Sequence, residues 1–379
     1  MRRKYFRTLD FPLLGAAAAI IAMSLPVLRS ASAGVSDDPY HFIVKQTISI
    51  VIGLVGMIVV MSINYNQFAR FSKWLYLGNL ILLAVVLVPG LGTEANGATS
   101  WIRVGPLSLQ PVEFAKILII LTFANFLVSR QGKLNTFREL IPCFLHFIFP
   151  MLLILKQPDL GSSLVFLVIL FGMLLVGGVR LSLLFSLLGS SLAGAVSWVF
   201  LNLKFGVPLP IKNYQLMRLI VFLNPYADGK GGRGFGYNVI QSLTAVGSGK
   251  IWGQGLGQGS QVQLNFLPEH HTDFIFSVVG EELGFAGSIF LLLMYFLLLY
   301  RLIKIAQNAK DMYGSLIVTG VISMFFYHVV QNVGMAIGIM PITGLPLPMF
   351  SYGGSSMMAN LIALGLALNV NLRRKKIMF

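Results

Sequence analysis

The chain has 379 residues, of which 56% are hydrophobic and 11% are charged, and its mean hydropathy is +0.80. This composition predicts a polytopic membrane protein rather than a water-soluble domain. The apolar runs are continuous and not alternating, which excludes a membrane β-barrel, so the predicted fold class is all-α.

Ten apolar runs approach the roughly 20 residues that a helix needs to cross a bilayer. In chain order they lie near residues 11–28, 43–63, 74–91, 110–128, 140–156, 160–178, 181–203, 274–300, 313–338 and 352–370. They leave no room for a separate soluble domain, so residues 1–379 are predicted to form a single membrane domain. The one long connection, 204–273, is predicted to be a large extracytoplasmic loop within it.

Lys and Arg gather in alternate short loops, as they do on the cytoplasmic side of a membrane. Their pattern predicts that both termini are cytoplasmic. The formal net charge of +15 is therefore explained by basic cytoplasmic loops that orient the chain and contact anionic lipid. No nucleic-acid partner is predicted.

The first run has an alternative interpretation. Basic residues precede it and Ala31-Ser32-Ala33 follows it, which resembles a signal peptide with a small-residue cleavage site. Because the run is about 18 residues long, more than a usual signal-peptide core, we expect it to be retained as a span.

The stretch 229–259 contains many glycines but no nucleotide site. "GQGLGQG" is not framed by a strand and a helix, and "GSGK" lacks both the earlier glycine and the following Ser or Thr of a phosphate loop. Two interpretations stay open. The segment is either a flexible loop or a place where the backbone closely approaches a bulky ligand.

Three carboxylates, Glu113, Asp159 and Asp273, fall where a predicted outer loop meets a span. Each would cost about 2.5–3.5 kcal/mol at the bilayer centre without a partner. Lys116 lies one helical turn after Glu113, and Lys156 is close to Asp159. This grouping predicts a polar cavity that opens to the outer face.

Each of these carboxylates also has a purely structural interpretation. Asp273 and Asp159 could cap the helices that follow them, and Glu113 with Lys116 could form an i, i+3 pair. Asp10, Asp228 and Asp311 fall in or beside loops, where we expect solvent to stabilise them.

Four long motifs carry a resemblance to a known family. They are "RLIVFLNPYADGKGGRGFGYNVIQSLTAVGSG", "LPEHHTDFIFSVVGEELGFAG", "KQPDLGSS" and "NVGMAIGIMPITGLPLPMFSYGGSS". Together they resemble the SEDS proteins (shape, elongation, division and sporulation) over nearly the whole chain. Thr343 stands where the division branch more often has lysine, so the chain is more similar to the elongation branch, RodA, with the division or sporulation branch as the alternative.

The resemblance implies an inverting glycosyltransferase that polymerises lipid II into peptidoglycan strands at the outer face of the bacterial cytoplasmic membrane. It implies no nucleotide cofactor. The implied partners are a class B penicillin-binding protein and other membrane proteins of the elongation complex. The family's essential aspartate falls at Asp273, the predicted catalytic residue. Two other classes stay open, a lipid II flippase and a non-catalytic scaffold.

The implied chemistry needs a base near the attacking hydroxyl and positive charge on the diphosphate leaving group. The predicted substrate-binding residues are Glu113, Lys116, Asp159, Arg218, Arg103 and His271. A divalent cation, Mg²⁺ or Mn²⁺, is predicted to bind Asp273 and Glu113. Glu281 and Glu282 lie further along the same run and are predicted to pair with cations inside the bundle.

Overall fold

The computed structural model describes residues 9–32, 40–95, 98–104, 107–206 and 213–374. All ten apolar runs form helices, which confirms the all-α membrane fold. The helices are α2 (Phe11–Ser32), α3 (His41–Ser62), α5 (Ser72–Val85), α6 (Pro111–Val128), α7 (Phe137–Lys156), α8 (Leu160–Val176), α9 (Leu181–Phe205), α13 and α14 (Ile275–Glu282 and Gly284–Gln307), α15 (Met312–Ala336) and α16 (Gly354–Leu372).

Among the described residues, eight helices are long and apolar enough to cross a membrane. α5 and α8, with 14 and 17 residues, are shorter than a straight crossing requires. The eighth run is not one helix, because it breaks between α13 and α14. Gly284 has a φ of +67° there, and a Cβ on it would lie 2.3 Å from the backbone nitrogen of Gly253. The close crossing of these two chain segments requires glycine.

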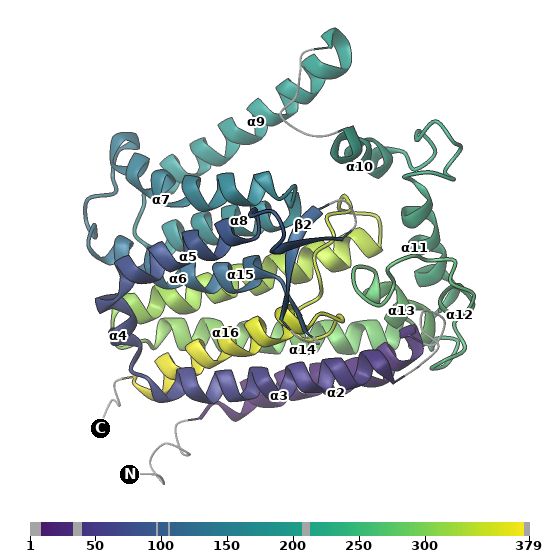
Figure 1. Ribbon diagram of the computed structural model, residues 1–379, viewed down its shortest axis with the longest axis horizontal. Coiled ribbons are helices and arrows are strands. Elements are labelled where there is room, and N and C mark those ends of the chain that lie inside the picture. The colour runs from purple at the N-terminus through teal and green to yellow at the C-terminus, as the bar shows by residue number, and fades with distance from the viewer. Residues whose placement is uncertain (1–8, 33–39, 96–97, 105–106, 207–212, 375–379) are drawn as a thin grey trace.

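The helices α6, α15 and α16 form the interior of the bundle, and most of their residues are buried. α3 packs along α16, and α15 contacts α8, α14 and α6. α9 reaches away from the bundle at its edge, where its side chains are largely exposed (Figure 1).

An ion pair and a hydrogen bond hold together the end of the bundle that the basic residues predict to be cytoplasmic. The Arg301 guanidinium donates to the Asp10 carboxylate at 2.6 Å, and the Tyr65 hydroxyl donates to Asp311 at 2.8 Å. Asp10 is buried, and Asp311 caps α15 through the N–H of Gly314. These two acids are therefore stabilised by protein groups, and the expectation that solvent stabilises them was wrong. We call the opposite end of the bundle the outer end.

A small antiparallel sheet lies at the outer end and was not predicted. Its strands β1 (Gly92–Ala95), β2 (Ala98–Val104) and β3 (Leu107–Leu109) pair in that order, with Ile102 opposite Leu109. β2 crosses in front of the helix ends (Figure 1). It brings Ser100 and Trp101 over the bundle.

In its described residues, the predicted outer loop contains the helices α10 (Asn213–Leu223), α11 (Tyr237–Ser248) and α12 (Ser260–Gln263). Elsewhere in the chain a further short helix, α4 (Tyr65–Arg70), follows α3. The glycine-rich turn of the outer loop closes around Asp228, whose carboxylate accepts backbone N–H groups at 2.7–3.3 Å. The donors are Lys230, Gly232, Gly234 and Gly236. These hydrogen bonds, that of Gly232 foremost, lower the pKa of Asp228 to about 2. The glycines thus let the chain fold around its own carboxylate.

The prediction that Glu281 and Glu282 pair with cations was wrong. Both side chains are fully buried, yet neither forms an ion pair with a described residue. Glu281 accepts the N–H of Gln261 at 2.8 Å, and Glu282 accepts the hydroxyl of Ser30. They therefore join α13 to α12 and α2 through neutral donors.

Candidate active site

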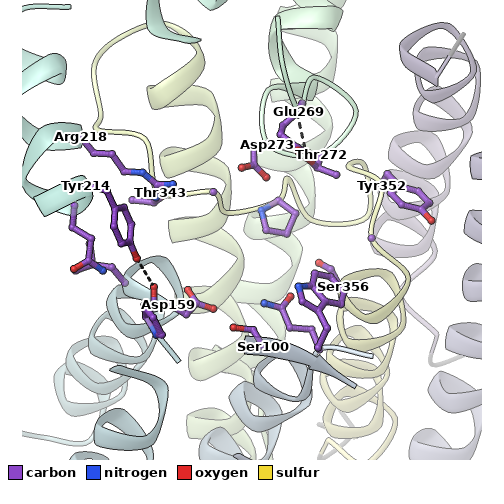
Figure 2. Close-up of a pocket in the computed structure, with 18 residues that line it drawn as sticks. Ser100, Asp159, Tyr214, Arg218, Glu269, Thr272, Asp273, Thr343, Tyr352 and Ser356 are labelled. Atoms are coloured by element: carbon purple, nitrogen blue, oxygen red, sulfur yellow. Dashed lines mark hydrogen bonds between the residues drawn. The ribbon is translucent and has the colours of Figure 1, made fainter. Parts of the chain in front are cut away.

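A polar cavity of about 300 Å³ lies at the outer end of the bundle. Figure 2 shows Asp273, Glu269 and Thr272 on one side of it and Asp159 and Ser100 on the other, with Arg218 and Tyr214 facing Tyr352 across it. The wall also includes Trp101, Gln110, Thr343, Gly344, Pro346 and Ser356. Three of the predicted site residues, Asp159, Arg218 and Asp273, are thus brought together from distant parts of the chain.

A tight turn before α13 directs Asp273 into the cavity. Glu269 has a φ of +51°, and its carbonyl accepts the N–H groups of Thr272 and Asp273 at 3.2 and 3.0 Å. The Thr272 hydroxyl donates to the Glu269 carboxylate at 3.2 Å. Positive φ is uncommon for a residue other than glycine and is often found at functional sites.

The helix-cap interpretation is wrong for Asp273 and right for Asp159. The N-cap of α13 is Phe274, and no side chain there accepts a capping hydrogen bond. Asp159 is the N-cap of α8 and accepts the N–H and hydroxyl of Ser162 at 2.9 and 2.7 Å. Asp273 therefore reaches the cavity without serving a helix end.

Asn332 on α15 connects the Asp273 turn to the loop 341–350. Its side-chain amide donates to the carbonyls of Asp273 and Leu345, each at 2.8 Å, and its side chain is fully buried. Gly344 has a φ of +74°, and a Cβ on it would lie 3.1 Å from Oδ2 of Asp273. One amide thus fixes both the aspartate and the loop that packs against its carboxylate.

The surroundings of Asp273 raise its pKa to about 6. Burial is the largest cause, and the carboxylates of Glu269 and Asp159 act in the same direction, while the Arg218 guanidinium opposes them. A carboxyl group with a pKa near 6 can accept and release a proton close to neutral pH. Such a perturbed acid in a cavity indicates a functional group.

Glu113 and Lys116 do not line the cavity, so the structure does not bring them together with Asp273. Both are buried, and the Lys116 ammonium donates to Glu113 at 2.8 Å and to Nε2 of His328 at 3.1 Å. Because Nε2 accepts, Nδ1 of His328 carries the hydrogen and donates to the carbonyl of Pro346 at 3.0 Å. This chain of contacts supports the cavity wall at Pro346.

Arg103 and His271 also lie outside the cavity wall. Arg103 is exposed on β2, opposite Ser108. The His271 ring packs against Phe42 and Tyr352, with centroids 5.1 and 6.0 Å apart, and burial lowers its pKa. His271 is therefore neutral near pH 7, and it supports Tyr352, whose N–H donates to the His271 carbonyl at 3.0 Å.

The predicted metal ligands do not converge. Glu113 is paired with Lys116 and does not line the cavity that Asp273 faces. No group of three or more His, Cys, Asp or Glu side chains within the described part of the chain could hold a metal ion. The described residues therefore do not fit a divalent cation held by protein ligands alone.

Several residues of the site were not singled out from the sequence as ligands. Asn332 had a weak signal, since it is a polar residue inside an apolar run, and Thr343 and Tyr352 lie in the last family motif. Ser100 and Trp101 had none, because their place depends on the unpredicted sheet. Glu269 lies in the same family motif as Asp273.

A family model described as "Cell cycle protein", for FtsW, RodA and SpoVE, matches residues 10–376. Stage V sporulation protein E of Bacillus subtilis is 39% identical over 93% of this chain and 94% of its own length. The probable peptidoglycan glycosyltransferase FtsW of Trichlorobacter lovleyi is 37% identical over 97% of this chain and 95% of its own length.

Two solved structures are similar over almost the whole chain. One belongs to work on the structural coordination of polymerization and crosslinking by a peptidoglycan synthase complex. It has a TM-score of 0.79 and 33% identity over 96% of this chain and 97% of its own. The rod shape determining protein RodA of Thermus thermophilus has a TM-score of 0.69 and 31% identity over 97% of this chain and 98% of its own.

We predict that Asn332→Ala loosens the cavity. The change removes the Asn332 donor from one buried and one partly buried carbonyl, at about 1–3 kcal/mol for a carbonyl left unpaired in the interior, so the thermal stability of the purified protein should fall. Hydrogen exchange should rise in 271–274 and 343–346. Asn369→Ala is the control, because Asn369 is also buried in a helix and donates to two backbone carbonyls, those of Val60 and Ile63, which lie outside the cavity. Equal exchange in the two variants would contradict the positioning role of Asn332.

Proposed function

Because the chain belongs to the family of cell cycle proteins that includes FtsW, RodA and SpoVE, we propose that it is a peptidoglycan glycosyltransferase that polymerises lipid II. The chain is a multi-pass protein of the bacterial cytoplasmic membrane. One observation carries the proposal. Asp273, with a pKa raised to about 6, faces a polar cavity at the end of the bundle predicted to be extracytoplasmic.

The reaction joins two lipid-linked sugars. The 4-hydroxyl oxygen of the acceptor forms a bond to the anomeric carbon of the donor, and the bond from that carbon to the diphosphate breaks with inversion. Asp273 is the base that takes the hydroxyl proton and later releases it to water. Its raised pKa makes the carboxylate a better proton acceptor than an ordinary aspartate and still leaves it mostly ionised at pH 7.

Arg218 stabilises the diphosphate leaving group. Arg218 lines the same cavity as Asp273, and its guanidinium lies 5.5 Å from the ring centroid of Tyr214. The Tyr214 hydroxyl donates to the carbonyl of Pro158 at 3.2 Å, which joins α10 to the start of α8. A guanidinium held in this way needs little reorganisation to bind charge that develops on phosphate oxygens.

A divalent cation that assists this reaction would need ligands from the diphosphate itself, because no three described His, Cys, Asp or Glu side chains are placed to hold a metal ion. For partners, we propose a class B penicillin-binding protein that crosslinks the new strands, together with other membrane proteins of the elongation complex. The similarity to a chain of a peptidoglycan synthase complex supports this proposal.

The test of the main proposal is Asp273→Asn. The variant should fold, insert and bind its partner as the wild type does, because Asp273 caps no helix. It should make no glycan polymer from purified lipid II in detergent, where the wild type does. Polymer at near the wild-type rate from Asp273→Asn would contradict the catalytic role. A wild type that moves lipid II across vesicles but forms no polymer would instead support a flippase.

The finer role that we propose is wall elongation and maintenance of cell shape. Thr343 lines the cavity beside Gly344, so the position at which division members more often carry lysine belongs to the site itself. A lysine there would add a positive charge to the cavity that holds Asp273.

Complementation tests this finer role. The chain should restore rod shape to a bacterium depleted of its elongation enzyme, and it should fail in one depleted of its division enzyme. Thr343→Lys, with wild-type abundance as the control, should weaken the elongation phenotype. Rescue of division or of spore formation alone would contradict the elongation role.

A further inference from the structure

An apolar groove of about 460 Å³ lies on the membrane-facing side of the bundle, between α5 and α7. Leu80, Ile81 and Ala84 line it from α5, and Phe149 and Leu152 line it from α7. Ile81, Phe149 and Leu152 are each more than half exposed. The groove contains one charged residue, Lys156, at the outer end of α7, where its side chain is exposed.

A short, fixed segment separates this groove from the cavity of Asp273. The buried Gln157 follows Lys156, and its amide donates to the carbonyl of Leu83 on α5 at 2.9 Å. The Gln157 carbonyl accepts the hydroxyl of Ser100 at 3.4 Å. Ser100 and Pro158, the next residue, both line the cavity. The groove and the cavity therefore meet on either side of Gln157.

We propose that this groove seats the polyprenyl chain of a lipid-linked substrate, with Lys156 beside its phosphates. The inference rests on the proposed function, which requires a sugar head group in the cavity while the chain stays in the membrane. The cavity wall is polar and carries three carboxylates, Asp159, Glu269 and Asp273, so it is unsuited to a hydrocarbon chain. The groove offers an apolar surface next to the cavity, and Lys156 provides a cation at the outer end of that surface.

In a bilayer, the groove and Lys156 contribute differently to substrate binding. Lipid tails are as apolar as leucine, so moving a polyprenyl chain from lipid into the groove releases little hydrophobic free energy. The groove therefore orients the chain by shape. Affinity at this point comes from the charge of Lys156 on phosphate at the membrane surface, where one cation changes binding about fivefold.

Two variants with matched controls test the inference. Leu152→Trp fills the groove, and Leu293→Trp on α14 is its control, because the two leucines are 51% and 54% exposed on lipid-facing helices. Lys156→Ala removes the cation. Its control is Lys204→Ala, which removes another exposed lysine from the outer end of a different helix, α9. All four proteins should be monodisperse with wild-type thermal stability before they are compared.

The probe is a photoreactive polyprenyl diphosphate. It should label 149–156 or 80–84 of the wild type, and unlabelled polyprenyl diphosphate should suppress the labelling while the same amount of phosphatidylglycerol does not. Leu152→Trp should lose the label and Leu293→Trp should keep it. In polymerisation assays, Lys156→Ala should raise the KM for lipid II about fivefold, with no change in Lys204→Ala.

The outcomes separate this inference from the proposed function. Labelling elsewhere, or labelling that phosphatidylglycerol suppresses equally well, would overturn the groove assignment even if the wild type makes polymer. Specific labelling in a wild type that makes no polymer would support the groove and contradict the polymerase.

Discussion

Two hydrogen bonds from Asn332 hold the site in its observed form. Its amide binds the carbonyl of Asp273 on one side and that of Leu345 on the other, within the buried interior of α15. The first bond fixes the turn that aims Asp273, and the second fixes the loop that carries Thr343, Gly344 and Pro346. A reacting carboxylate must be held within a fraction of an ångström to be effective, and rigid helices provide this better than loops.

Asp273 differs from the other carboxylates of the bundle in the groups that surround it. Asp10 is neutralised by Arg301, and Glu113 by Lys116. Asp159 caps a helix, and Asp228 accepts four backbone N–H groups that lower its pKa. Asp273 instead lies near two other carboxylates and is balanced by Arg218. The cations and N–H donors of the bundle thus stabilise the acids with structural roles. Asp273 faces the cavity with a raised pKa.

The sequence predicted the helices well because a membrane span needs a long apolar run whatever its neighbours are. It also predicted that Asp159, Arg218 and Asp273 share a site, through the position of loops relative to spans and through family motifs. Spacing along one helix could not show which neighbour Glu113 and Lys116 face, so their burial against His328 was missed. The break at Gly284 and the small sheet depend on contacts between distant segments, which no local pattern reveals.

The pH dependence of kcat/KM for lipid II polymerisation tests the central claim most directly. Asp273 acts as a base only when ionised, so the rate should rise with pH through an apparent pKa of about 6 and then level off. Glu269→Gln removes a carboxylate that raises this pKa, so the rise should move to lower pH. A rise centred near pH 4, or one that does not move in Glu269→Gln, would contradict the account.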